Sequence, residues 1–60
     1  MSVEKLWDVF DEDGILMDTH EAPTAWAALT RQAELYASEM EGGCSPTMLR
    51  RWGWLVRRAT

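Results

Sequence analysis

The stretch KLWDVFDEDGILMDT, residues 5–19, decides the fold. Its first six residues are rich in aromatic and β-branched side chains, which favours a strand over residues 5–10. A turn sequence with two aspartates and a glycine follows at residues 11–14, and glycine adopts positive φ there without steric penalty. Residues 15–19 resume an apolar segment. Two such runs around an Asp-Gly pair predict a β-hairpin.

The middle of the chain predicts one long helix over residues 23–41. Pro23 suits the first helical turn, where its missing N–H costs nothing. Apolar residues then recur at helical spacing, at Ala22, Ala25, Trp26, Leu29, Ala33, Tyr36, Ala37 and Met40. Gly42 and Gly43 end this helix, as glycine commonly does.

Residues 45–59 fit two interpretations. Ser45 and Pro46 are typical of a helix N-cap and first turn. In the favoured interpretation a short helix ends before Gly53, and residues 54–59 form a third strand. In the alternative a single helix continues to the end of the chain, although Gly53 inside it would cost about 1 kcal/mol relative to alanine.

The expected fold class is α+β. A small antiparallel sheet, made of the hairpin and the C-terminal strand, is covered on one face by one long helix in the order ββα(α)β. The alternative is ββαα, with a C-terminal helix. We expect Trp7 and Trp26 in the core, because the strand and helix faces that carry them can meet.

Length and composition limit what can stabilise this fold. Sixty residues form one small domain, 1–60, which buries only about 60% of the surface that its unfolded chain exposes. Cys44 is the only cysteine and His20 the only histidine, so we expect no disulfide, no structural zinc and no cofactor. An EF-hand loop aligned on Gly14 would place Val9 and His20 at ligand positions, which argues against a calcium site. Weak cation binding at the acidic turn stays open.

The chain lacks signals for export or membrane insertion. Residues 1–5 lack the basic region and apolar stretch of a signal peptide. No apolar run approaches the ~20 residues of a membrane helix. With a lone cysteine, this predicts a protein of the reducing cytoplasm that makes no membrane contact. For a phage-encoded protein this would be the host cytoplasm.

Charge is distributed unevenly along the chain. All ten acidic residues precede Gly42 and are opposed there only by Lys5 and Arg31, which leaves eight net negative charges. Four arginines and no acid follow. This asymmetry suggests a partner or self-association. We expect the arginines to offset the acids, within one chain or across a dimer.

The segment FDEDGILMDT, residues 10–19, resembles the first motif of haloacid-dehalogenase-type phosphatases, D-x-D-G-x-L-x-D-[ST] after an apolar strand. The resemblance implies Asp11 as nucleophile, Asp13 as general acid/base and Mg²⁺ to offset their charge. It covers ten residues of sixty, and Ile15 stands where the family usually has Thr or Val. The family's downstream lysine and acidic metal-binding motif have no counterpart after residue 20. We therefore expect no enzyme, with a phosphatase remnant as a distant alternative.

The function we predict is non-catalytic binding of another protein, as an inhibitor or adaptor of the phage or mobile-element type. The expected surface combines the acidic hairpin with the Trp/Arg C-terminal segment. Its residues are Asp11, Glu12, Asp13, Arg50, Arg51, Trp52, Trp54, Arg57 and Arg58. Nucleic-acid binding, with the arginines on phosphates and a tryptophan stacked on a base, is the alternative. A homodimer is plausible, because edge strands and spare tryptophans need cover.

Overall fold

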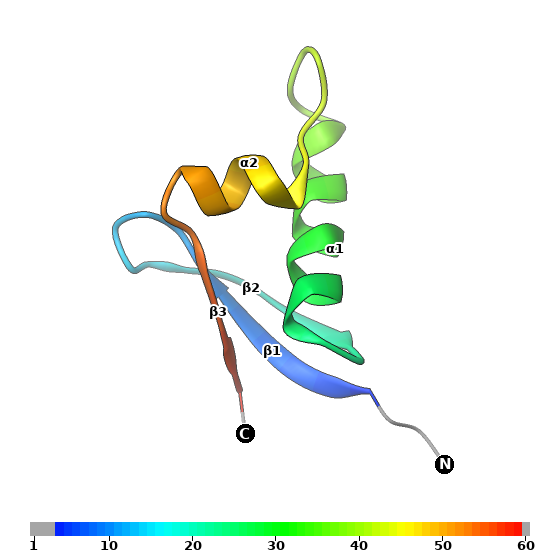
Figure 1. Ribbon diagram of the computed structural model, residues 1–60, viewed down its shortest axis with the longest axis vertical. Coiled ribbons are helices and arrows are strands. Elements are labelled where there is room, and N and C mark those ends of the chain that lie inside the picture. The colour runs from blue at the N-terminus through cyan, green and yellow to red at the C-terminus, as the bar shows by residue number, and fades with distance from the viewer. Residues whose placement is uncertain (1–3, 60) are drawn as a thin grey trace.

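The computed structural model describes residues 4–59 of the chain. Its elements, in chain order, are β1 (Lys5–Phe10), β2 (Leu16–Ala22), α1 (Ala25–Ala37), α2 (Pro46–Arg51) and β3 (Leu55–Arg58). The strands form one antiparallel sheet in the order β2-β1-β3, and α2 runs crosswise to α1 (Figure 1). The α+β fold with a C-terminal strand is therefore confirmed, and the ββαα alternative is wrong.

The hairpin forms as predicted, but its second strand is longer. Gly14 has φ +80°, the backbone state for which the turn needs glycine. β2 pairs with the whole length of β1, as far as Lys5 opposite Ala22. The predicted end at Thr19 was wrong, because this pairing extends the strand by three residues. His20 consequently lies in a strand, opposite Trp7.

The long helix is shorter than predicted at both ends. It begins after Thr24, whose hydroxyl accepts a hydrogen bond from the Ala27 N–H at 3.1 Å. The Thr24 hydroxyl therefore supplies an acceptor for one of the first-turn N–H groups, which have no partner inside the helix. A helix that began at Pro23 would lack this cap. At the other end the Ser38 hydroxyl donates to the Leu35 carbonyl at 2.7 Å, and the chain continues in turns rather than helix. Such side-chain bonds compete with helical backbone bonds.

The C-terminal segment turns sharply between α2 and β3. The Ser45 hydroxyl caps α2 by accepting from the Met48 N–H at 3.2 Å. Gly53 follows the helix with φ +96°, and its N–H donates to the Arg50 carbonyl. A positive φ directly after a helix lets the chain leave the helical direction, and glycine takes this conformation most readily. This turn makes β3 the third strand.

One core joins the sheet to both helices. Its buried residues are Val9, Leu29, Ala33, Leu49 and Trp54. The Tyr36 ring meets Trp54 edge to face, with ring centroids 5.1 Å apart. The prediction that Trp26 belongs to this core was wrong. Trp26 is 53% exposed, because the buried stripe of α1 runs along Ala28, Leu29, Gln32 and Ala33 and leaves Trp26 to one side.

Candidate functional site

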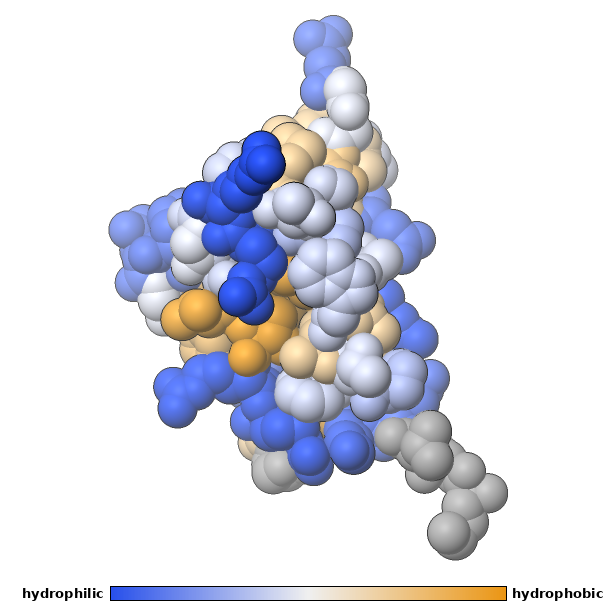
Figure 2. Space-filling view, viewed as in Figure 1, coloured by the Kyte–Doolittle hydropathy of each residue, from blue (hydrophilic) through white to orange (hydrophobic). Residues whose placement is uncertain are grey.

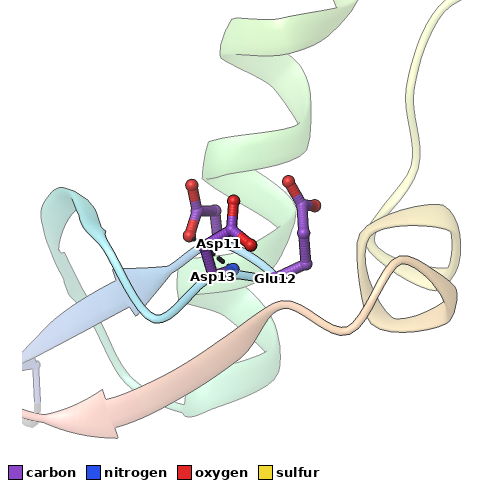
Figure 3. Close-up of side chains that lie close together, drawn as sticks. All are labelled: Asp11, Glu12 and Asp13. Carbon is purple, nitrogen blue, oxygen red and sulfur yellow. Dashed lines mark hydrogen bonds between the residues drawn. The ribbon is translucent and has the colours of Figure 1, made fainter.

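The acidic turn is organised by Asp11. Its Oδ1 accepts hydrogen bonds from the Asp13 and Ile15 backbone N–H groups, both at 2.9 Å. Its carbonyl accepts from the Gly14 N–H, which closes the turn. Figure 3 shows the carboxylates of Asp11, Glu12 and Asp13 grouped around this turn. Asp11 therefore does the ordinary structural work of an aspartate in a turn.

The three turn carboxylates offer oxygen ligands within 4.8 Å of one another. Two of these carboxylates already accept hydrogen bonds, Asp11 through Oδ1 from the turn and Glu12 through Oε2 from Trp54. Glu12 and Asp13 are exposed to solvent. This is the geometry of carboxylates gathered by a tight turn, and the turn chemistry alone accounts for it.

The structure lacks the framework that the phosphatase motif implies. The sheet has three antiparallel strands, whereas that family carries its motif on a large doubly wound domain. Lys5, the only lysine, lies at the opposite end of β1 from Asp11. Positioning several charged groups around one phosphoryl group is what this chemistry requires. The described residues do not bring such groups together at the turn.

The acidic turn lies directly against the segment that joins α2 to β3. Glu12 Oε2 accepts a hydrogen bond from Trp54 Nε1 at 2.8 Å, across 42 residues of sequence. The backbone of Gly53 is so close that an added Cβ would lie 3.6 Å from the Cβ of Glu12. The structure therefore brings together two segments that the sequence analysis assigned to one surface.

We call this surface the turn surface. It combines the acidic turn with the end of α2, and its exposed or half-buried residues are Asp11, Glu12, Asp13, Ile15, Arg50, Arg51 and Trp52. Trp52 caps the C-terminal end of α2 and is 40% exposed, while Ile15 is 59% exposed. In Figure 2 strongly hydrophilic side chains lie directly beside hydrophobic surface in the region of α2 and β3.

Trp54 does not belong to the turn surface, which corrects its predicted role in partner binding. It is 3% exposed and packs in the core against Tyr36. The indole can be buried because its N–H has Glu12 as acceptor, and an unpaired buried N–H would be costly. The burial of Trp54 is indicated in the sequence by its spacing from Val56, which puts both side chains on the helix-covered face of the sheet.

The four C-terminal arginines do not form one basic patch. Arg50 and Arg51 lie in the last turn of α2. Arg57 lies opposite Asp8 in the register of β1 and β3, on the sheet face away from α1. The guanidinium of Arg58 lies 5.4 Å from the Trp7 ring on the other face. This divergence weakens the nucleic-acid interpretation, because a polyanion cannot follow all four charges, and the buried Trp54 is not available for base stacking.

The expected charge compensation within the chain is not observed. Across residues 4–59 the ion pair found is Arg31 with Glu4, at 3.6 Å between Nη2 and Oε1. Within that range, none of the four C-terminal arginines forms an ion pair with an acidic side chain. Arg50 and Arg51 therefore lie beside the acidic turn without an acidic partner in residues 4–59.

The face of the sheet away from α1 is a second feature, which we call the open face. Neither described helix covers it, because α1 and α2 pack on the side of Val9 and Trp54. By strand alternation its residues are Leu6, Asp8, Phe10, Leu16, Thr19, Glu21, Leu55 and Arg57. Leu6, Leu16 and Leu55 are more than 40% exposed on it. Exposed apolar area of this kind often marks an interaction site.

Residues on the open face form rows across the three strands. Leu16, Phe10 and Leu55 lie side by side and make an apolar row. In the next row Asp8 lies between Thr19 and Arg57. The Thr19 hydroxyl donates to Asp8 Oδ1 at 2.5 Å. Of the open-face residues the sequence alone points only to Arg57, because the strand register is needed to group the others.

His20 joins β2 to α1 through a hydrogen bond between its Nε2 and Gln32 Oε1, at 2.7 Å. Gln32 is the buried polar side chain among the described residues. A shallow pocket of about 320 Å³ beside this pair is lined by His20, Arg31, Glu34 and Leu35. Arg31 already donates to the Glu21 carbonyl and pairs with Glu4, so this pocket holds no free cation. The bond explains why a histidine occurs inside β2.

Tyr36 borders both the core and the acidic turn. Burial raises the pKa of its phenol, and the nearby acids Glu12, Glu39 and Asp11, with Cys44, raise that pKa further. The phenol therefore stays neutral near pH 7, where it acts as a packing group.

Comparison of the chain with protein-family models, with curated proteins and with solved structures found no match. Neither helix in residues 4–59 has both the length and the apolar content needed to cross a lipid bilayer.

Proposed function

We propose that this chain is a non-catalytic protein-binding module, and that the turn surface contacts a second protein. The observation that supports this most is the contact of Glu12 with Trp54 and Gly53, which sets the acidic turn beside the exposed Trp52. An exposed tryptophan next to arginines is the composition enriched at protein-binding hot spots. Charged groups of both signs around it suit a partner with a complementary charge pattern.

The absence of a catalytic function is part of this proposal. A covalent mechanism needs a nucleophile and a base within hydrogen-bond reach of each other. His20 bonds to Gln32, and the thiol of Cys44 donates a weak hydrogen bond to the Ser45 carbonyl, at 3.9 Å. Asp11 is held by two backbone N–H groups. None of these side chains is paired as nucleophile and base.

A pull-down with charge-neutralised variants tests the proposal. The triple variant Asp11→Asn, Glu12→Gln and Asp13→Asn removes three charges from the turn and keeps its hydrogen-bond acceptors. The matched control, Asp18→Asn, Glu34→Gln and Glu41→Gln, removes three charges from exposed positions elsewhere. We expect wild type and control to capture the same stoichiometric partner from source-cell lysate, and the turn variant to capture about tenfold less. Equal capture by both variants would refute the turn surface as the binding site.

A further inference from the structure

The outer edge of β3 presents backbone groups that nothing in the described chain pairs. The Ala59 N–H donates to the Leu6 carbonyl, across β3 and β1. Backbone groups alternate in direction along a strand, so those of Arg57 also point toward β1, whereas those of Val56 and Arg58 point away from the sheet. In residues 4–59 no group forms a hydrogen bond with these outward N–H and C=O groups.

The other edge of the sheet, formed by β2, is blunted. Met17 has no partner in β1, because the register shifts between Val9 and Phe10 and leaves one extra residue in β2. The Arg31 side chain donates to the carbonyl of Glu21, which by the same alternation lies on the outer side of β2. Bulges and covering groups protect an edge strand from pairing with another chain. β3 has neither device, since it pairs with β1 in an unbroken register.

Charge selects the kind of segment that fits β3. Arg57 lies on the open face and Arg58 on the helix-covered face, where its guanidinium lies over Trp7. Asp8, opposite Arg57, offsets only part of this positive charge. Two copies of β3 paired edge to edge would bring four arginines together, which disfavours a second copy of the chain. We propose that β3 binds an extended, acidic segment of another protein, which adds to the sheet as a fourth strand.

The backbone directions define the expected pairing. An antiparallel segment exchanges hydrogen bonds with Val56 and Arg58, the residues whose outward groups are unpaired. Its residues opposite Arg57 and Arg58 are acidic and lie on the two faces of the sheet. Its residue opposite Leu55 is apolar and covers part of a side chain that is 56% exposed. The contact uses no residue of the turn surface, so it stands or falls independently of the proposed function.

A peptide titration of the full ¹⁵N-labelled chain, followed by two-dimensional NMR, tests the pairing. The probe is the blocked hexapeptide Ac-EETVTV-NH2, and the control is Ac-KKTVTV-NH2. We expect the acidic peptide to shift the amide signals of Val56 and Arg58 and to slow their exchange with solvent. The dissociation constant should be on the order of 1 mM, because a short peptide must become ordered when it binds.

The alternation along β3 makes the result specific. The Arg57 amide already faces β1, so its signal should change least. Equal shifts from the basic peptide, or shifts at Thr19 on β2 in place of Val56 and Arg58, would overturn the proposal. Absence of any shift up to about 5 mM acidic peptide would overturn it as well.

Two substitutions at position 58 separate charge from backbone pairing. Arg58→Gln removes the charge and should weaken binding of the acidic peptide about two- to fivefold, the range of one cross-strand charge pair. Arg58→Pro also removes the outward N–H, which an edge strand tolerates. It should bind at least about threefold more weakly than Arg58→Gln, because one more hydrogen bond is lost.

Circular dichroism checks that both variants fold, and the wild-type titration does not depend on either of them. Equal affinity of wild type and a folded Arg58→Pro for the acidic peptide would refute strand addition at β3. That outcome leaves the pull-down result on the turn surface untouched.

Discussion

The bond from Trp54 to Glu12 couples the core to the acidic turn. It lets a large indole be buried without an unpaired N–H, and it fixes the turn beside the end of α2. Glu12→Ala should lower the free energy of unfolding by about 1–2 kcal/mol, because the indole N–H loses its acceptor. Glu12→Gln retains an acceptor and should lose less. Urea denaturation followed by tryptophan fluorescence measures both, and equal stability of wild type and Glu12→Ala would contradict the account.

Gly53 makes the turn that creates the third strand. Its φ of +96° is unfavourable for a residue with a Cβ, so Gly53→Ala should lower the free energy of unfolding by about 1–2 kcal/mol. Asparagine tolerates positive φ better, so Gly53→Asn should cost less than alanine does. Thermal denaturation of the three proteins gives this order. An alanine variant as stable as wild type would mean that the turn does not depend on glycine.

Tyr36, the only tyrosine, reports on the packing at the acidic turn. Its raised pKa means that the folded state favours the neutral phenol, chiefly because of burial. The stability from this group is thus fully present below the ordinary pKa of about 10 and is lost as pH rises through the folded value. Ultraviolet titration of the folded chain should give a midpoint above that of the urea-unfolded chain. A folded midpoint at or below the unfolded one would contradict the described packing.

Tryptophan placement shows the limit of sequence reasoning for single residues. The turn role of Gly14 and the cap role of Ser45 follow from local chemistry, and both were predicted correctly. The predicted positions of Trp26 and Trp54 were wrong. Trp26 was expected in the core and is exposed, whereas Trp54 was expected on the surface and is buried. Burial depends on which helix stripe faces the sheet and on a distant acceptor, Glu12, and neither follows from local sequence.

At the scale of elements, hydroxyl caps define where both helices begin. Thr24 and Ser45 each accept a backbone N–H three residues ahead. Thr24→Ala should therefore lower the free energy of unfolding by about 1 kcal/mol, and Thr24→Ser should restore most of it, since serine is an equally good cap. Chemical denaturation monitored by circular dichroism checks this. No loss in Thr24→Ala would place the helix start elsewhere.

Element type was predictable from sequence, whereas element ends were not. The hairpin, both helices and the C-terminal strand follow from turn residues and periodicity. The end of β2 is set by pairing with β1 as far as Ala22, and the end of α1 by the Ser38 hydroxyl. The open face could not be grouped from sequence either, because the irregularity between Val9 and Phe10 shifts the register of β2. Pairing across strands is a tertiary property.

At the scale of the whole molecule, the acidic and basic parts of the chain meet without neutralising each other. The fold brings the acidic turn against the end of α2, yet the arginines there find no acidic partner in residues 4–59. Charge that is left unpaired on a small domain is available to other molecules. The proposed role of the turn surface depends on this feature.

The affinity of the captured partner for Trp52→Ala, compared with Trp26→Ala, tests the proposed function most directly. Both tryptophans are exposed, but Trp52 lies on the turn surface and Trp26 on α1. Isothermal titration should show a loss of at least tenfold, or about 1.4 kcal/mol, for Trp52→Ala and wild-type affinity for Trp26→Ala. Wild-type affinity in Trp52→Ala would contradict the assignment of the binding site.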